Sequence, residues 1–205
     1  MIRNLLCTCL IYSFIISNVY ANEAIKLLKI NKTEFVALES KVKSNIVKEQ
    51  SNDFALNVVK NDQSFDVVID NVKKIRLIPI SYESSNARNR VCTLLVFSPE
   101  NELLNTIKLH YEIPDEDEVV ASCIGIQAVA LEHKNNSDYL IYLLRYSAGN
   151  QYGDTVFIAS ITSDKINKDE ALTTCVSNNQ DIGSIVKIRK AIKKCLSKTV
   201  LPGKK

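Results

Sequence analysis

The sequence predicts an α+β fold: a mainly antiparallel β-sheet with a C-terminal amphipathic helix packed on it, held by two disulfides. In the middle of the chain, short runs of β-branched residues alternate with polar turns, as antiparallel strands do. Near the C-terminus the apolar period lengthens to about 3.6 residues, which indicates a helix. Four cysteines follow the N-terminal leader, and an even number favours disulfide pairs.

Residues 1–21 have the pattern of a secretory signal peptide. A short lead containing Arg3 precedes the apolar run Leu5–Val19, and cleavage is predicted after Ala21. The run is shorter than the roughly 20 residues that a membrane-spanning helix needs. We therefore expect one globular domain, residues 22–205, that is exported and has no stable membrane insertion after cleavage. Its compartment would be the periplasm if the source is bacterial, and otherwise the extracellular space.

The cysteines of the mature chain lie far apart in sequence. They are Cys92, Cys123, Cys175 and Cys195. Four cysteines allow three pairings, and we favour Cys92–Cys123 with Cys175–Cys195 because each pair lies within one neighbourhood of the chain. Without a C-x-x-C spacing, zinc binding and thioredoxin-like chemistry are disfavoured.

Residues 23–50 fit two alternatives. Four apolar residues recur at helical spacing with charged residues between them: Phe35, Leu38, Val42 and Ile46. Residues 24–30 fit an edge strand equally well, so both readings stay open.

The next segments read as strands. Phe54–Val59, Phe65–Ile69 and Ile75–Ile80 are short, β-branched and bounded by polar residues. Pro79 lacks an N–H group and suits an edge or a bulge. Residues 91–97 and 103–111 are predicted to form a hairpin across a turn at 98–101.

Three more apolar runs follow. Residues 119–131 precede a predicted polar turn at 133–138, and two runs within residues 139–161 flank a polar loop, Ala148–Gly153. Because the last two runs are nearly all apolar, we expect them to be central strands rather than edge strands.

The C-terminal segment is predicted to be a helix capped by Asp181. Its apolar positions are Ile182, Ile185, Val186, Ile188, Ile192 and Leu196. Its outward face is Lys187, Arg189, Lys190, Lys193, Lys194 and Lys198. We favour an ordinary amphipathic helix packed on a sheet over a helix that touches lipid headgroups or an anionic polymer.

Charge and motifs exclude several functions. The full chain carries +3, and loss of Arg3 with the leader leaves +2 (3 − 1), so nucleic acid is not a predicted partner. The chain lacks the G-x-S-x-G, H-E-x-x-H and phosphate-loop motifs. Its two histidines fall in a predicted strand, His110, and a predicted turn, His133. We therefore predict no catalytic residue, metal site or cofactor.

Two segments are candidates for contact with another protein. The 148–153 loop and its flanks combine aromatic, amide and Arg side chains, a composition typical of interfaces: Arg145, Tyr146, Asn150, Gln151 and Tyr152. The second is an acidic run that would attract a cationic partner: Asp115, Glu116, Asp117 and Glu118.

The leading functional hypothesis is an exported, non-catalytic binding protein. Its most concrete form is a bacterial periplasmic inhibitor or immunity-type protein that occludes a secreted or cell-wall-degrading enzyme or toxin. Two alternatives stay open: an envelope hydrolase whose active site follows no recognisable motif, and a structural component of envelope assembly.

Overall fold

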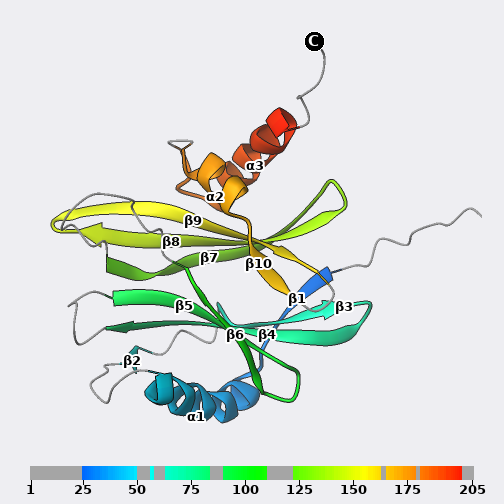
Figure 1. The fold of residues 1–205 in the computed structure, drawn as a ribbon, viewed down its shortest axis with the longest axis vertical. Coiled ribbons are helices and arrows are strands. Elements are labelled where there is room, and N and C mark those ends of the chain that lie inside the picture. The colour runs from blue at the N-terminus through cyan, green and yellow to red at the C-terminus, as the bar shows by residue number, and fades with distance from the viewer. Residues whose placement is uncertain are drawn as a thin grey trace, which may run out of the picture.

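The computed structural model describes residues 25–49, 56–57, 63–83, 90–109, 122–162, 165–178 and 181–199. The predicted leader, His110 and the acidic run 115–118 lie outside these ranges. The described residues confirm the α+β class and form two antiparallel sheets with three helices (Figure 1).

Sheet A holds the strands from the first half of the chain. Its order is β1-β3-β4-β5-β6, with β2 also paired to β4. The strands are β1 (Ile25–Lys29), β2 (Leu56–Asn57), β3 (Phe65–Ile69), β4 (Val72–Glu83), β5 (Arg90–Phe97) and β6 (Leu103–Lys108).

Sheet B holds the later strands in the order β10-β9-β8-β7. The strands are β7 (Ser122–Lys134), β8 (Ser137–Ala148), β9 (Gln151–Ile161) and β10 (Ile166–Lys168). β8 pairs with β9 on one side and β7 on the other, so it is a central strand as predicted. β9 is also internal, although only three of its residues pair with β10.

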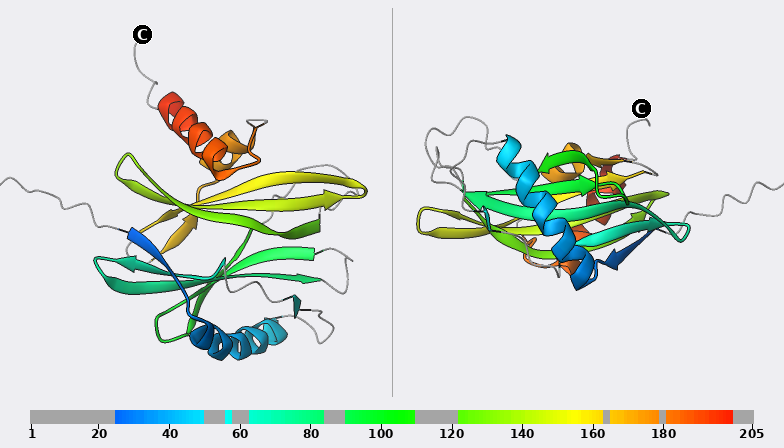
Figure 2. Two further views of the ribbon diagram at one scale, coloured as in Figure 1. Left: turned by 180° about the vertical axis from the view of Figure 1, so that it is seen from behind. Right: turned by 90° about the horizontal axis from the view of Figure 1, so that it is seen from below.

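The two sheets stack face to face and helices cover both outer faces (Figures 1 and 2). α1 (Lys32–Glu49) packs on sheet A, while α2 (Glu170–Ser177) and α3 (Ile185–Thr199) pack on sheet B. The molecule therefore has four layers, helix–sheet–sheet–helix, where the sequence pattern predicted one sheet with one covering helix.

Strands buried on both faces explain the nearly continuous apolar runs, because successive side chains point to opposite faces. One set of β8 side chains enters the core between the sheets: Leu140, Tyr142, Leu144 and Tyr146. The alternate set packs under α2 and α3: Tyr139, Ile141 and Leu143. β4 divides in the same way between sheet B and α1.

The N-terminal segment contains both of the structures that its sequence allowed. β1 is an edge strand of sheet A, paired with β3. α1 begins directly afterwards because the Asn31 side chain accepts a hydrogen bond from the backbone N–H of Glu34 at 2.9 Å. Phe35, Leu38 and Val42 then form its buried face against sheet A.

Both predicted disulfides are present. Cys92 on β5 pairs with Cys123 on β7, with the Cα atoms 5.7 Å apart, and so joins the two sheets. Cys175 on α2 pairs with Cys195 on α3, with the Cα atoms 6.1 Å apart.

Turn residues set the hairpin registers. The β7–β8 turn consists only of Asn135 and Asn136, both with positive φ (51° and 59°), as a type I′ turn requires. The predicted 133–138 turn was therefore too long, and His133 lies in β7. Pro79 falls between the end of the β3 register at Leu77 and the start of the β2 register at Ser81, an edge-like position within β4.

The predicted C-terminal helix is present, but two details of the prediction were wrong. α3 starts at Ile185, and Ser184 accepts from the N–H of Lys187, so Ser184 caps the helix in place of Asp181. Val186 is 61% exposed and is not a core position. α2 was not predicted; Asp169 caps it by accepting from the N–H of Leu172 at 2.9 Å.

A charged cluster lies between α1 and sheet A. Asp66 and Arg76 are directly opposite on β3 and β4, and Arg76 Nε donates to Asp66 Oδ1 at 2.9 Å. Asp66 is 1% exposed and Arg76 is 6% exposed. Lys73 reaches the other Asp66 oxygen at 2.7 Å, and Arg76 also donates to Asn101 Oδ1 at 2.6 Å. Glu34 on α1 lies 3.6 Å from the Arg76 guanidinium, so the cluster ties the helix to the sheet.

The inter-sheet core holds two buried tyrosines that should respond oppositely to loss of the hydroxyl. The Tyr142 hydroxyl has no hydrogen-bond partner among the described residues, and burial raises its pKa above the ordinary range. We expect Tyr142→Phe to raise the free energy of unfolding by about 1–2 kcal/mol, because an unsatisfied buried group is removed. Its ring still packs on Phe157, with the centroids 6.3 Å apart.

Tyr146→Phe is the matched control. The Tyr146 hydroxyl donates to the Leu109 carbonyl at 3.2 Å. Loss of this hydrogen bond should lower the free energy of unfolding by about 1 kcal/mol. Urea unfolding of the two variants beside the parent measures both changes. Destabilisation by Tyr142→Phe would show that the hydroxyl is satisfied in solution.

Candidate functional site

The β8–β9 hairpin ends in a two-residue turn, Gly149–Asn150, between the paired residues Ala148 and Gln151. The predicted six-residue loop was therefore too long, because residues 151–153 already belong to β9. Gly149 has φ of 58°, and Asn150 is not among the residues with positive φ. A positive φ at the first turn position alone fits a type II′ turn, which suits the twist of a hairpin and favours glycine there.

The tip of this hairpin is exposed and carries an aromatic side chain. Tyr152 is 72% exposed and lies opposite Ser147. Further along the same pair of strands, Arg145 Nε donates to Asp154 Oδ1 at 3.1 Å. Opposite residues share one face of a sheet, and positions 145 and 147 are two apart, so these four side chains lie on the same face.

We call this exposed set the hairpin surface. It consists of Arg145, Asn150, Gln151, Tyr152 and Asp154. The α2–α3 connection also approaches it, since a Cβ atom placed on Gly183 would lie 3.7 Å from Asp154 Oδ2.

Tyr146, which the sequence placed with the contact residues, is in the core. Its side chain faces sheet A, and desolvation raises the pKa of its phenol above the ordinary range. The alternation along β8 causes this, because Tyr146 shares the inward face of Leu144 while Arg145 faces outward.

The β8–β9 hairpin is held in place close to its tip. Tyr146 lies opposite Cys123, and Cys123 is bonded to Cys92 of the other sheet. The register of β8 and β9 continues without a bulge from Asp138–Ile161 to Ala148–Gln151. The Tyr152 tip is thus mounted on a cross-linked core.

Of the other predicted features, only His133 lies within the described residues. The acidic run Asp115, Glu116, Asp117 and Glu118 lies outside the described residues, as does His110. His133 Nδ1 lies 3.0 Å from Asp138 Oδ1 across the β7–β8 pair, next to the turn at the opposite end of β8.

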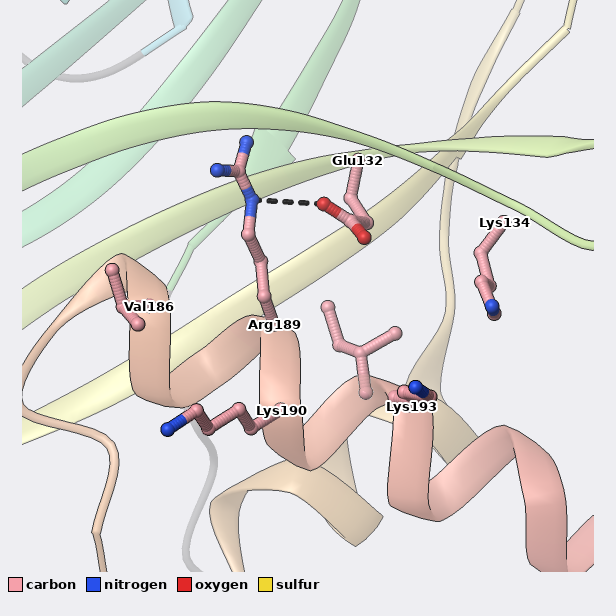
Figure 3. A pocket seen from close by; sticks show the side chains of 7 residues that line it. Glu132, Lys134, Val186, Arg189, Lys190 and Lys193 are labelled. Atoms are coloured by element: carbon pink, nitrogen blue, oxygen red, sulfur yellow. Dashed lines mark ion pairs between the residues drawn. The ribbon is translucent and has the colours of Figure 1, made fainter.

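A second candidate site, a pocket, lies between β7 and α3 (Figure 3). It has a volume of about 340 Å³. Its lining is mainly basic: Glu132, Lys134, Val186, Arg189, Lys190, Ile192 and Lys193. Arg189 donates to Glu132 at 2.8 Å and to the Leu131 carbonyl at 2.9 Å, and so fixes the helix to the edge strand.

Sequence reasoning recognised the basic face of α3 but not this site. The pattern does not reveal Lys134, which precedes the β7–β8 turn and is far from the helix in sequence. Only the fold places it opposite α3. Within the described ranges, no group of three or more His, Cys, Asp and Glu side chains gathers to hold a metal ion.

Comparisons with known proteins add no relative: no family model, curated protein or solved structure matches the chain. None of the helices in the described part of the chain combines the length and the apolar character needed to cross a bilayer.

Proposed function

We propose that this protein is an exported, non-catalytic binding protein that presents its hairpin surface to another protein. The most concrete form is a bacterial periplasmic inhibitor or immunity-type protein, which would neutralise a secreted or cell-wall-degrading enzyme or toxin by occluding it.

The exposed Tyr152 beside Arg145 is the observation that carries this proposal. A large aromatic ring that stays in water in the free protein can be buried on binding, and Tyr and Arg are enriched among residues that dominate binding energy. The neighbouring amides of Asn150 and Gln151 supply hydrogen-bonding groups of the kind found around such anchors.

The mounting of the hairpin supports occlusion as the mechanism. A two-residue turn on long paired strands leaves little backbone freedom to lose when the tip is buried. The Cys92–Cys123 bond fixes β7 where it pairs with β8 close to the tip. A preorganised tip therefore spends less of its contact energy on ordering.

The cysteines support export. All four cysteines of the predicted mature chain pair in the structure, and such disulfides persist in oxidising compartments. Together with the leader pattern at residues 1–21, this favours the periplasm for a bacterial source and the extracellular space otherwise.

The central test is the effect of Tyr152→Ala on a captured partner. The mature protein is used as bait in envelope extract from its source, and the affinity of the recovered protein is then measured by calorimetry. We expect a stoichiometric complex that Tyr152→Ala weakens about thirtyfold or more, since a buried aromatic anchor contributes about 2 kcal/mol or more. The same complex should show loss of the partner's enzymatic activity.

Leu104→Ala is the matched control, because Leu104 is a half-exposed apolar residue on β6 of the other sheet. It should leave the affinity unchanged. If Tyr152→Ala bound the partner as tightly as the parent protein does, the hairpin would not be the contact surface. If the bait recovered only a sugar polymer or a lipid, the proposal of an enzyme inhibitor would be wrong.

A further inference from the structure

The pocket between β7 and α3 concentrates unpaired positive charge. α3 contains Lys and Arg but neither Asp nor Glu. Lys187 pairs with Asp181 and Arg189 pairs with Glu132. The three lysines that line the pocket have no ion-pair partner among the described residues: Lys134, Lys190 and Lys193.

These charges come from two elements that face each other. Figure 3 shows Lys134 reaching down from β7 and Lys193 lying on the facing side of α3. The ion pair between Arg189 and Glu132 joins the two walls of the pocket. Lys134 and Lys193 lie toward the same end of it, whereas the Lys190 ammonium group extends away (Figure 3). An anion placed between Lys134 and Lys193 would interact with both ammonium groups.

The free donors of the pocket are lysine ammonium groups. The planar fork of an arginine binds carboxylate and phosphate groups through two parallel hydrogen bonds. In the pocket, however, Arg189 already donates Nε to Glu132 and a terminal nitrogen to the Leu131 carbonyl. The remaining donors are lysine ammonium groups, compact charges that suit the several oxygens and the higher charge of a phosphate.

The size and the apolar lining indicate an organic phosphate. About 340 Å³ lies at the lower end of the range for small-molecule sites. Val186, which is 61% exposed, contributes apolar surface next to the lysines. We propose that this pocket binds a phosphate group carried on a small organic molecule or on a lipid headgroup.

The proposal is independent of the hairpin surface, with which it shares no residue. Both sources of phosphate are tested with the mature protein. Glycerol 3-phosphate and pyrophosphate are titrated while the amide resonances are followed by NMR. Co-sedimentation is measured with phosphatidylcholine vesicles that contain or lack phosphatidylglycerol. Citrate, a polycarboxylate, tests whether the site prefers phosphate.

We expect saturable shifts centred on Lys134 and on α3 around Lys190 and Lys193, weakened by salt. Lys134→Ala/Lys193→Ala should lower the affinity about tenfold, since each lysine near an anionic group contributes up to about fivefold. Neither side chain is buried, so the variant should fold normally.

Lys26→Ala/Lys29→Ala is the matched control, because it removes two exposed lysines from β1 at the edge of the other sheet. It should change the affinity less than about twofold. Binding of the soluble phosphates assigns a free ligand, and binding of anionic vesicles alone assigns a headgroup. The proposal is overturned if neither probe binds, if citrate binds equally well, or if the control variant loses as much affinity.

Discussion

Replacing Cys92 and Cys123 together by alanine is expected to lower the free energy of unfolding by about 4–5 kcal/mol, the largest loss of any change considered for this protein. Most of that loss arises in the unfolded chain. The bond closes a loop with a sequence separation of 31 residues, for which the chain-entropy model gives about 4 kcal/mol.

The position of the bond in the fold adds to this loss. Cys92 and Cys123 are fully buried in the core between the sheets, so the alanine pair also removes packed sulfur atoms. The Cys92–Cys123 bond joins the second-to-last strand of sheet A to the edge strand of sheet B. A domain at the lower end of the usual range of about 5–15 kcal/mol would keep almost no net free energy of unfolding.

Cys175→Ala/Cys195→Ala is the comparison that isolates the role of the inter-sheet bond. Its loop has a separation of 20 residues, for which about 3 kcal/mol is expected, and it joins only two helices on one face. Urea unfolding followed by circular dichroism measures both variants. A larger loss in the helix pair than in the sheet pair would contradict the prediction.

The sequence predicted the strands well because burial on both faces leaves a strong local signal. The apolar runs at 139–147 and 155–161 are interior strands, as expected. The division of the strands between two sheets was missed, since each strand shows how buried it is but not which strand it pairs with. The apolar runs of β4, β5, β8 and β9 nevertheless indicate sheets that are covered on both faces.

Local signals also explain the errors at the candidate sites. Without the register, the turn at Gly149–Asn150 cannot be separated from a longer loop, and so Tyr146 was counted with the exposed residues although it alternates inward. α2 was missed because Thr173, Thr174 and Val176 are β-branched and favour strands. Its cap at Asp169 was the available signal.

The sequence also carries a signal for the Asp66–Arg76 pair. Each charge interrupts an apolar strand, and a charge in a sheet covered on both faces requires a buried partner.

Asp66→Asn is expected to lower the free energy of unfolding by about 3–4 kcal/mol. Asparagine has nearly the same shape as aspartate, but Arg76 would stay buried with only Glu34, a partly exposed carboxylate, 3.6 Å away.

The double variant Asp66→Leu/Arg76→Met tests the reason for that loss. Buried ion pairs are costly to desolvate, so removing both charges should return the stability to within about 1 kcal/mol of the parent. Glu39→Gln is the control on α1, since it breaks an exposed pair with Lys43 at 2.9 Å and should cost less than about 0.5 kcal/mol.

Chemical denaturation of the parent, Asp66→Leu, Arg76→Met and the double variant closes a mutant cycle and yields the coupling between the two charges. Recovery of stability in the double variant would mean that the loss in Asp66→Asn comes from an uncompensated Arg76. If the double variant were as unstable as Asp66→Asn, the pair would contribute net stability. Its hydrogen bonds to Lys73 and Asn101 would then be the reason, because they extend the pair into a network that leucine and methionine cannot replace.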